Sequence, residues 1–345
     1  MGAFGGWLMP IEYEGTLAEH EAVRSAVGLF DVSHLGKVSA SGAEALDALQ
    51  VSLTNDLSRV PVGGAQYGMA LDDDGGILDD LIVYRLGEDE YLVVPNAANV
   101  ERVRDQISSH GPPEVDLVVR DDLALLAPQG PRSLELVERH FREAASLAYM
   151  HCAYSTWEGA PIVVARSGYT GERGYELFVP NTAAEELWNR LTRDGEALGM
   201  RPCGLAARDT LRLEMGYPLH GSDIDQHRTP LEAELGWAVA MEKGEFPGRE
   251  ALAVQRAEGI PSRLVGLRMT DRLIPRAHYV VYANDEPVGE VTSGTFSPTL
   301  RLGIALAYVD RRDDLVPGVE VEVDVRGRRG AARIVTPPFV DRSPR

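Results

Sequence analysis

The sequence predicts an α+β fold in which antiparallel sheets are covered by helices and a small antiparallel β-barrel follows. Segments between residues 65 and 119 follow the order β-β-β-α-β, which is typical of an antiparallel sheet with helices on one face. A second round with a similar element order lies between residues 123 and 216. From Leu264 onward, short strands and turns dominate, as they do in small barrels.

Size and composition limit the possible functions. The 345 residues are enough for two or three domains with a sizeable core. The formal net charge of −19 argues against nucleic acid and against an anionic membrane surface as partners. No apolar run has the length of a transmembrane helix, and no signal peptide opens the chain. The two cysteines, Cys152 and Cys203, form no disulfide framework, so we expect a cytoplasmic protein.

The first round opens with two helices that carry N-terminal signals. Thr16-Leu-Ala-Glu19 is a capping box, and its helix is expected to end near Gly28. The predicted elements that follow are a helix capped by Ser41-Gly-Ala-Glu44, a hairpin over 67–84, a strand at 91–94, a helix begun by Asn96 with Val100, Val103 and Ile107 on its buried side, and a strand at 115–119.

The second round and the barrel follow the same logic. Their predicted elements are a strand at 123–126, a helix from Pro131, strands at 161–166 and 174–179, a helix with Leu187, Trp188 and Leu191, a helix from Pro202 to Gly216, and barrel strands at 280–281, 288, 304–309 and 319–325. Residues 241–263 are charged and are interpreted as a connector. Residues 292–299 are predicted to form an irregular loop.

The hairpin over 67–84 contains the most informative pattern. Asp74-Gly75-Gly76 supplies the positive φ angles of a tight turn. In the second strand, Asp79 and Asp80 lie among strongly apolar residues. Because side chains alternate along a strand, the two must point opposite ways, so we expect one to face water and the other an apolar interior. A solvated strand end and a functional carboxylate in a cleft both remain possible from this pattern.

Other kinds of site have little support. His220, Asp223, Asp225 and His227 form the only His/Asp cluster, which we interpret as a polar loop, with a metal site as a distant alternative. No glycine-rich nucleotide loop and no nucleophilic serine elbow are present.

Eleven stretches match the sequence motifs of one family: GWLMP at 6–10, GLFDVSHLG at 28–36, TND at 54–56, AQY at 65–67, GGILDDLIVYRL at 75–86, NAAN at 96–99, QGP at 129–131, SGYTGERGYEL at 167–177, PCGLAARDTLRLEMGYPLHG at 202–221, TPLEAELGWAV at 229–239 and TSGTFSPTL at 292–300. Together they resemble the aminomethyltransferase (T-protein) of the glycine cleavage system. Each piece is weak alone, but eleven pieces in order over almost the whole chain are a specific signal.

The resemblance implies a fold in more detail. It implies three domains in a ring around a central folate channel, the last being a jelly-roll-like barrel. We assign residues 1–52 plus 121–240 and residues 53–120 to two intertwined α+β domains, 241–263 to a connector and 264–345 to the barrel. We expect residues 292–299 to face the channel entrance, although a turn that only closes the barrel is nearly as good an explanation.

The resemblance also implies a site. The key aspartate of the family falls on Asp80, and the folate contacts fall on Tyr67, Tyr84, Asn96, Tyr169, Glu176 and Arg208, with Tyr149 a looser match. The chemistry of these residues agrees, because an aromatic wall and a buried carboxylate suit a pterin, and an arginine suits an anionic tail. Tyr84 and Tyr149 could instead be core aromatics, and Arg208 could pair with Glu214 or Asp209.

The implied reaction transfers an aminomethyl carbon from the lipoyl arm of the H-protein to tetrahydrofolate, without a metal. Two alternatives remain among relatives of the fold. One is a folate-dependent demethylase of a small methylated amine, and the other is a folate-binding iron–sulfur assembly factor with a Lys-Gly-Cys-Tyr-x-Gly-Gln motif. The corresponding loop here, Ser167–Glu172, has no cysteine, which counts against the assembly factor.

Overall fold

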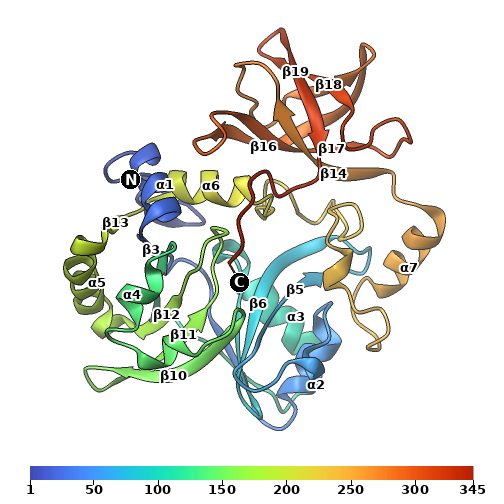
Figure 1. Cartoon of the computed structure of the whole chain (residues 1–345). Coiled ribbons are helices and arrows are strands. Elements are labelled where there is room, and N and C mark those ends of the chain that lie inside the picture. The colour runs from blue at the N-terminus through green and yellow to red at the C-terminus, as the bar shows by residue number, and fades with distance from the viewer. Residues whose placement is uncertain (345) are drawn as a thin grey trace.

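The computed structural model describes residues 1–344. It contains a six-stranded sheet and a five-stranded sheet that lie beside each other, and a closed barrel placed above both in the view of Figure 1. Helix α6 (Leu205–Glu214) runs beneath the barrel, across the middle of the molecule (Figure 1). The mixed α+β class and the C-terminal barrel predicted from the sequence are confirmed.

The five-stranded sheet is built around the predicted hairpin. Its strands, in spatial order, are β5 (Ala65–Leu71), β6 (Ile77–Gly87), β7 (Glu90–Val94), β4 (Val38–Ser41) and β8 (Asp116–Val119). Leu71 pairs with Ile77 across the turn, where Gly75 has a φ of 84°. Helices α2 (Ala45–Ser52) and α3 (Val100–His110) cover one face and pack on alternate strand residues such as Leu81 and Val83.

The six-stranded sheet buries both of its faces. Its strands, in spatial order, are β10 (His151–Trp157), β11 (Ala160–Arg166), β12 (Glu176–Pro180), β9 (Leu123–Gln129), β3 (Gly28–Asp31) and β13 (Arg201–Pro202). Helices α4 (Ser133–Val137) and α5 (Asn181–Gly195) cover one face. The other face shares a core with α1 (Thr16–Ser25), with α6, and with Tyr84 and Leu92 of the five-stranded sheet.

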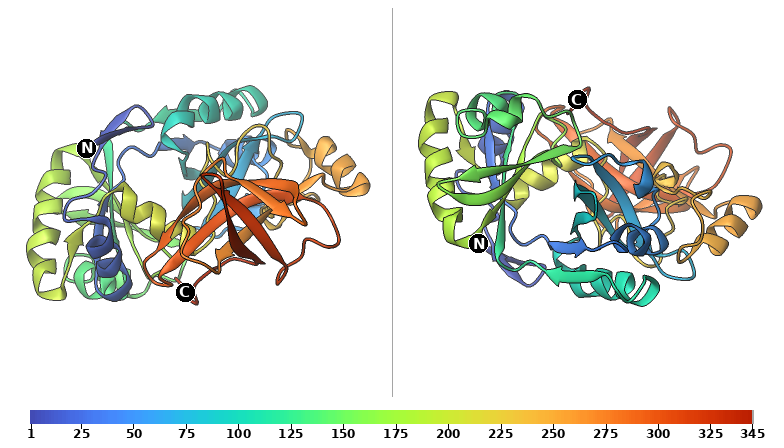
Figure 2. Two further views of the ribbon diagram at one scale, coloured as in Figure 1. Left: turned by 90° about the horizontal axis from the view of Figure 1, so that it is seen from above. Right: turned by 90° about the horizontal axis from the view of Figure 1, so that it is seen from below.

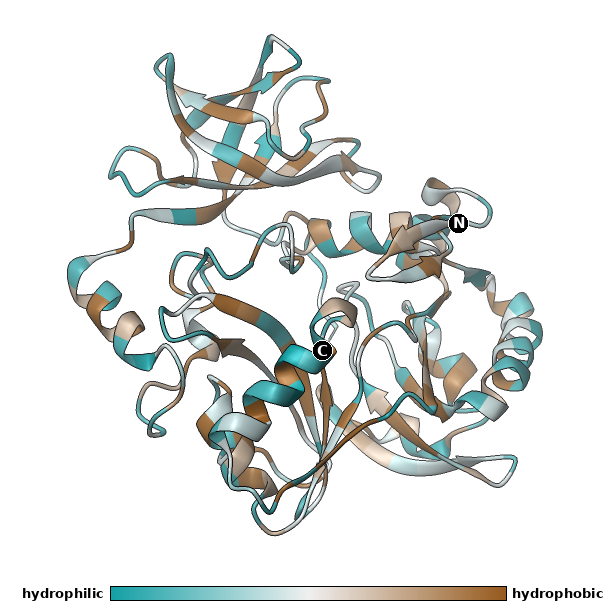
Figure 3. Ribbon diagram, turned by 180° about the vertical axis from the view of Figure 1, so that it is seen from behind, coloured by the Kyte–Doolittle hydropathy of each residue, from teal (hydrophilic) through white to brown (hydrophobic). Residues whose placement is uncertain are grey.

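This shared core joins the two sheets, which lie side by side when seen from above and below (Figure 2). Hydrophobic residues are concentrated on the strands, whereas the helices mix hydrophilic and hydrophobic residues (Figure 3). The second face of strand β6 is therefore also covered, by the six-stranded sheet and α6.

The barrel closes in the order β14-β17-β16-β15-β18-β19. Its strands are β14 (Ser262–Met269), β15 (Val280–Ala283), β16 (Glu286–Ser297), β17 (Leu302–Asp310), β18 (Glu320–Val325) and β19 (Arg328–Val335). The predicted loop at 292–299 is wrong for most of its length, because β16 continues to Ser297 with a register shift between Val291 and Ser293. The shift is a β-bulge, which strands tolerate.

Two other local expectations are corrected. Thr16 does not cap α1, because Glu19 accepts hydrogen bonds from the backbone N–H groups of residues 13, 14 and 15. The predicted connector is partly regular, since it contains α7 (Arg249–Glu258) and ends inside β14. The remaining elements are β1 (Gly2–Phe4), β2 (Trp7–Met9) and the short 3-10 helices Leu57–Arg59, Ala97–Asn99, Arg142–Ala145, Glu196–Leu198 and Gly236–Ala238.

Within residues 1–344, no helix combines the length and the apolar character needed to cross a membrane.

A buried ionic cluster attaches the barrel to α1 and α6. Glu214 is 0% exposed and accepts hydrogen bonds from Arg24 Nη2 at 2.7 Å, Ser297 Oγ at 2.5 Å and Thr299 Oγ1 at 2.9 Å. Burial alone would raise the pKa of Glu214, but the hydrogen bond and charge of His20, the Ser297 bond and the Arg24 charge outweigh it and lower the pKa to about 2. The ionised carboxylate is thus part of the folded state.

We expect Glu214→Gln to lower the free energy of unfolding at pH 7 by about 3 kcal/mol, because the buried Arg24 loses one of its two carboxylate partners and keeps only Glu172. A depressed carboxyl pKa contributes stability above its ordinary value of 4.5, and this contribution is lost as the pH falls toward 2. The difference in the free energy of unfolding between wild type and Glu214→Gln, measured by urea denaturation, should therefore become smaller below pH 4.5. The control is Glu135→Gln, which removes an exposed partner of Arg132. A free-energy difference for Glu214→Gln that does not change with pH would contradict the ionised state assigned to Glu214.

Candidate functional site

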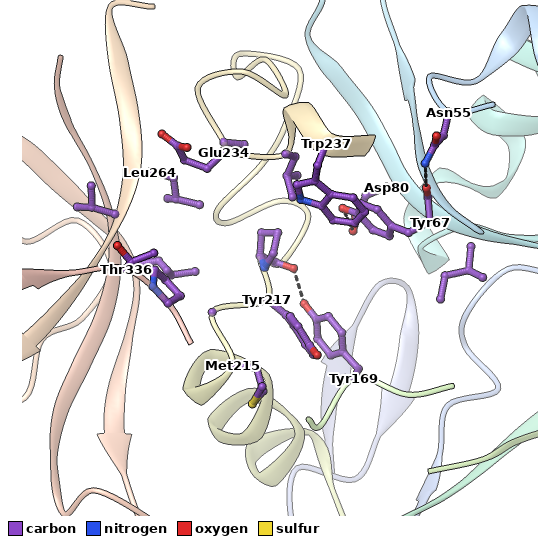
Figure 4. Close-up of a pocket in the computed structure, with 18 of the residues that line it drawn as sticks. Asn55, Tyr67, Asp80, Tyr169, Met215, Tyr217, Glu234, Trp237, Leu264 and Thr336 are labelled. Carbon is purple, nitrogen blue, oxygen red and sulfur yellow. Dashed lines mark hydrogen bonds between the residues drawn. The ribbon is translucent and has the colours of Figure 1, made fainter. Parts of the chain in front are cut away.

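A cavity of about 780 Å³ lies where the five-stranded sheet, the end of α6 and the barrel meet. Its lining comes from the strands of the hairpin, the segment after α6 and the near side of the barrel (Figure 4). The lining residues on which the argument depends are Tyr67, Asp80, Tyr149, Tyr169, Tyr217 and Trp237.

The structure brings four of the eight predicted site residues to the cavity wall. These are Tyr67, Asp80, Tyr149 and Tyr169. The other four, Tyr84, Asn96, Glu176 and Arg208, lie outside the set of lining residues and contact residues of the wall or of the layer behind it.

Asp80 is the carboxylate that faces the cavity. Its Oδ2 accepts a hydrogen bond from the Tyr67 hydroxyl at 3.1 Å, and its Oδ1 accepts one from Asn96 Nδ2 at 2.9 Å. Burial raises the pKa of Asp80, while the charge of His220 and the bonds from Tyr67 and Asn96 oppose that rise. The side chain is half-buried, so it combines access to the cavity with partial removal from water.

The expectation that one of the two aspartates faces water is wrong. Asp79 points away from the cavity, as alternation requires, but its residue is 0% exposed because α3 and its preceding turn cover that face. Its carboxylate accepts hydrogen bonds from Asn96 Nδ2 at 2.9 Å and Asn99 Nδ2 at 2.7 Å. Burial, followed by the charge of Asp80, raises the pKa of Asp79, and the hydrogen bonds from Asn96 and Asn99 oppose that rise.

Two stacked aromatic pairs stand beside the carboxylate. Trp237 stacks on Tyr67 with ring centroids 5.4 Å apart and planes 25° apart, and Tyr217 stacks on Tyr169 at 5.6 Å and 30° (Figure 4). Sequence reasoning missed Trp237 and Tyr217 as site residues. Both lie inside stretches that carry the family resemblance, so an aromatic residue within a matched loop was the available signal.

Glu176 and Tyr84 form a unit behind the wall. The Tyr84 hydroxyl donates to Glu176 Oε2 at 2.6 Å, and Ser167 Oγ lies 2.5 Å from the same oxygen. Tyr84 is 0% exposed, so the alternative of a core aromatic describes its ring correctly. Its hydroxyl nevertheless fixes the position of the Glu176 carboxylate, which is half-buried.

Arg208 does not pair with Asp209 or Glu214, which contradicts the alternative raised from the sequence. Asp209 bonds Arg212, and Glu214 bonds Arg24. The Arg208 guanidinium lies 4.6 Å from the Tyr169 ring centroid, and burial lowers its pKa. No hydrogen bond or ion pair joins it to another residue within 1–344, so its five N–H donors remain available to an anionic group.

The segment 292–299 does not face the cavity. Ser293 is 7% and Ser297 0% exposed, and neither lines the cavity. Their hydroxyls contact Arg212 and Glu214 of α6. The prediction that this segment lies at a channel entrance is therefore wrong, because its polar side chains attach the barrel to the helix.

The His/Asp cluster lies in an irregular segment, as predicted. Asp223 Oδ2 pairs with Arg212 Nη1 at 2.6 Å, while His220 Nδ1 is 3.1 Å from Asn99 Nδ2. Among the described residues, no group of three or more His, Cys, Asp or Glu side chains could hold a metal ion.

The arrangement suits a ligand with a flat ring and a negatively charged group. Stacked aromatic rings offer flat walls, Asp80 and Glu176 offer hydrogen-bond acceptors, and Arg208 offers donors. The Tyr169 hydroxyl donates to the Pro218 carbonyl, which fixes this ring in the wall.

Comparisons with known proteins agree along the whole chain. The family described as GCVT N-terminal domain matches residues 1–243, and that described as glycine cleavage T-protein C-terminal barrel domain matches residues 263–341. The chain is 51% identical to an aminomethyltransferase of Frankia alni, covering 100% of this chain and 95% of the relative. It is 46% identical to an aminomethyltransferase of Mycobacterium avium, covering 98% and 92% of the two chains.

A solved structure is also similar. The glycine cleavage system aminomethyltransferase T of Bartonella henselae superposes with a TM-score of 0.93 at 35% identity, covering 99% of this chain and 94% of that one. Sequence identity above one half and matching folds over the full length lead to one conclusion: the chain belongs to the glycine cleavage T-protein family.

Proposed function

We propose that this protein is the aminomethyltransferase of a glycine cleavage system and uses tetrahydrofolate as the acceptor. In the reaction, the aminomethyl carbon leaves the sulfur of a lipoyl arm and becomes the methylene group of 5,10-methylenetetrahydrofolate. Ammonia is released, and the arm is left as a dithiol. The observation that carries the proposal is the half-buried Asp80 carboxylate, held by Tyr67 and Asn96 at the wall of a 780 Å³ cavity.

The residues of the cavity wall and of the layer behind it fit a folate. A pterin is flat and presents N–H donors along one edge, so the stacked pairs Tyr67–Trp237 and Tyr169–Tyr217 and the Glu176 carboxylate suit it. The guanidinium of Arg208 suits an anionic group because no carboxylate within 1–344 forms an ion pair with it. When bound, tetrahydrofolate supplies the nucleophilic nitrogens of the reaction.

The role of Asp80 is electrostatic. The transfer builds positive charge near the migrating carbon and the amine that departs, and a carboxylate at the wall stabilises that charge. Tyr67 and Asn96 hold the two oxygens in fixed positions, so little reorganisation is needed when the charge develops. Asp80 also lies where it can accept a proton from the reacting groups and return it to the ammonia that leaves.

The finer architecture is also a proposal. We propose that the two sheets and the barrel are three domains around a folate channel, of which the cavity is the central part. Strand β4 and helix α2 belong to the five-stranded sheet, so a boundary between Asp31 and Val38 fits the sheets better than one at residue 52. The barrel domain then follows α7 and begins at Ser262.

The proposed partner is a lipoylated carrier, the H-protein of the same system. Trp237 is 69% exposed at the cavity, so one face of its ring is accessible from outside. A slender arm that carries its reactive carbon at the tip can reach Asp80 without the rest of the carrier entering. Turnover of aminomethylated carrier with tetrahydrofolate, measured beside sarcosine, distinguishes this function from that of a demethylase.

We expect Asp80→Asn to lower kcat by roughly 100-fold or more, because the amide keeps the shape of the side chain but removes its charge. The affinity for tetrahydrofolate should change far less. Methylenetetrahydrofolate formation under saturating substrates measures kcat, and titration calorimetry measures the affinity. An Asp80→Asn enzyme with full turnover would show that alignment alone carries the reaction.

We expect Glu176→Ala to weaken tetrahydrofolate binding by about 1–3 kcal/mol, since a buried donor of the ligand would lose its acceptor. Tyr84→Phe is the matched variant, because it keeps the carboxylate but removes one of the hydroxyls that position it. Calorimetry should therefore give a smaller loss for Tyr84→Phe than for Glu176→Ala. Unchanged affinity in Glu176→Ala would remove Glu176 from the ligand site.

A further inference from the structure

A second carboxylate lies directly behind the proposed catalytic one and has no part in the mechanism above. Asp79 is 0% exposed in a region lined by Asn96, Asn99 and the loop that carries His220. Two adjacent acidic residues, both removed from water, are costly to maintain. The hydrogen bonds of Asp79 indicate which role the second carboxylate has.

Asp79 holds one residue at two points. Its Oδ2 accepts the backbone N–H of Asn96 at 2.9 Å, and its Oδ1 accepts Asn96 Nδ2, also at 2.9 Å. The same Asn96 Nδ2 lies 2.9 Å from Asp80 Oδ1 and 3.0 Å from the Asp80 carbonyl oxygen. The Asn96 amide is thus the direct link between the two aspartates.

The sheet explains why a side chain is needed there. Strand β7 pairs with β6 up to Val94, which lies opposite Ile82. Continuing this register would place Pro95 opposite Leu81 and Asn96 opposite Asp80. In that register the Asn96 N–H would face the Asp80 carbonyl, but it donates to Asp79 Oδ2 at 2.9 Å, so regular pairing ends and the Asp80 carbonyl lacks a backbone partner on this edge. The Asn96 side chain takes that place, and its orientation depends on Asp79.

The start of β6 is fixed from the other side by the loop that follows α6. Ile77 N donates to the carbonyls of Arg228 at 3.0 Å and Asp225 at 3.1 Å. His220 Nε2 lies 3.3 Å from the Ile77 carbonyl, and His220 Nδ1 lies 3.1 Å from Asn99 Nδ2. Asn99 then passes its other N–H to Asp79.

We propose that Asp79 is a positioning residue for aminomethyl transfer, which holds the Asn96 amide against Asp80 so that the Asp80 carboxylate keeps one position at the cavity wall. The proposal rests on the proposed role of Asp80. Asp79 does not touch the cavity, and it acts only through Asn96.

The first test is Asp79→Asn. An amide has one acceptor oxygen, whereas Asp79 uses two, so either the Asn96 backbone N–H or the two side-chain amides would face a donor. We expect kcat to fall about tenfold, because a small misplacement of a reacting group is enough for such a loss. The affinity for tetrahydrofolate and the KM for the carrier should stay within twofold. A loss of stability alone would not produce this separation of kcat from binding.

The control is another buried carboxylate. Glu19 is 0% exposed, lies outside the cavity lining and accepts hydrogen bonds from the backbone N–H groups of residues 13–15 and of Gly204, so Glu19→Gln should lower the melting temperature but leave kcat per folded molecule unchanged. If Asp79→Asn fails to fold, Asn99→Ala replaces it, since it removes one donor from Asp79 without changing charge. We expect kcat to fall about threefold in Asn99→Ala, and an unchanged kcat there would overturn the proposal.

A double-mutant cycle tests the route. If Asp79 acts through Asn96, the variant carrying both Asp79→Asn and Asn96→Ala should have the same kcat as Asn96→Ala alone. Losses that multiply would overturn the proposal, because Asp79 would then act independently. If Asp79→Asn keeps full turnover while Asp80→Asn loses it, the positioning role is wrong and the proposed function stands. If Asp80→Asn is itself silent, the role of Asp80 fails first.

Discussion

The end of regular pairing between β6 and β7 is the constraint on which the site depends. The ladder stops at Val94, and the Asn96 N–H that would continue it donates to Asp79 Oδ2 instead. The beginning of β6 must therefore find partners elsewhere, and it finds them in the Asn96 side chain and in the loop after α6. These partners are one side-chain amide and the backbone carbonyls of Asp225 and Arg228, not a neighbouring strand. A sheet edge of this kind can hold two aspartates where a continuous ladder would have offered them apolar neighbours.

Helix α6 connects this edge to the rest of the molecule. Ala207 and Leu211 enter the core shared by both sheets, while Arg212 and Glu214 bind the barrel strand β16. Arg208 lies between these contacts and points over Tyr169. One helix therefore places a cation near the cavity and attaches the barrel beside it. The geometry of the cavity depends on the buried ionic cluster around Glu214, although that cluster is not part of the lining.

The sequence predicts the pieces of this fold better than their packing. The hairpin, the barrel and most helices follow from periodicity and turn residues, which are local properties. One of the two aspartates is predicted to face water because alternation assigns side chains to faces but does not say what covers each face, and here both faces of β6 are covered. The prediction of a loop at 292–299 is wrong because the residues that bind its hydroxyls, Arg212 and Glu214, lie about 80 residues earlier in the chain, where a local sequence pattern does not detect them. Trp237 was missed since stacking on Tyr67 joins distant segments.

The partners of the two aspartates determine what the pair can do. Glu214 and Asp223 are also buried, but arginines pair with them, so their charges are largely cancelled. Asp79 and Asp80 are instead bonded by amides and a phenol, which donate hydrogen bonds without carrying a positive charge. Such donors offset part of the cost of burial and leave a net negative potential at the cavity wall. A pair with an arginine would give a more stable carboxylate and a weaker field, so the use of Asn96 and Asn99 favours a site that stabilises a cationic group.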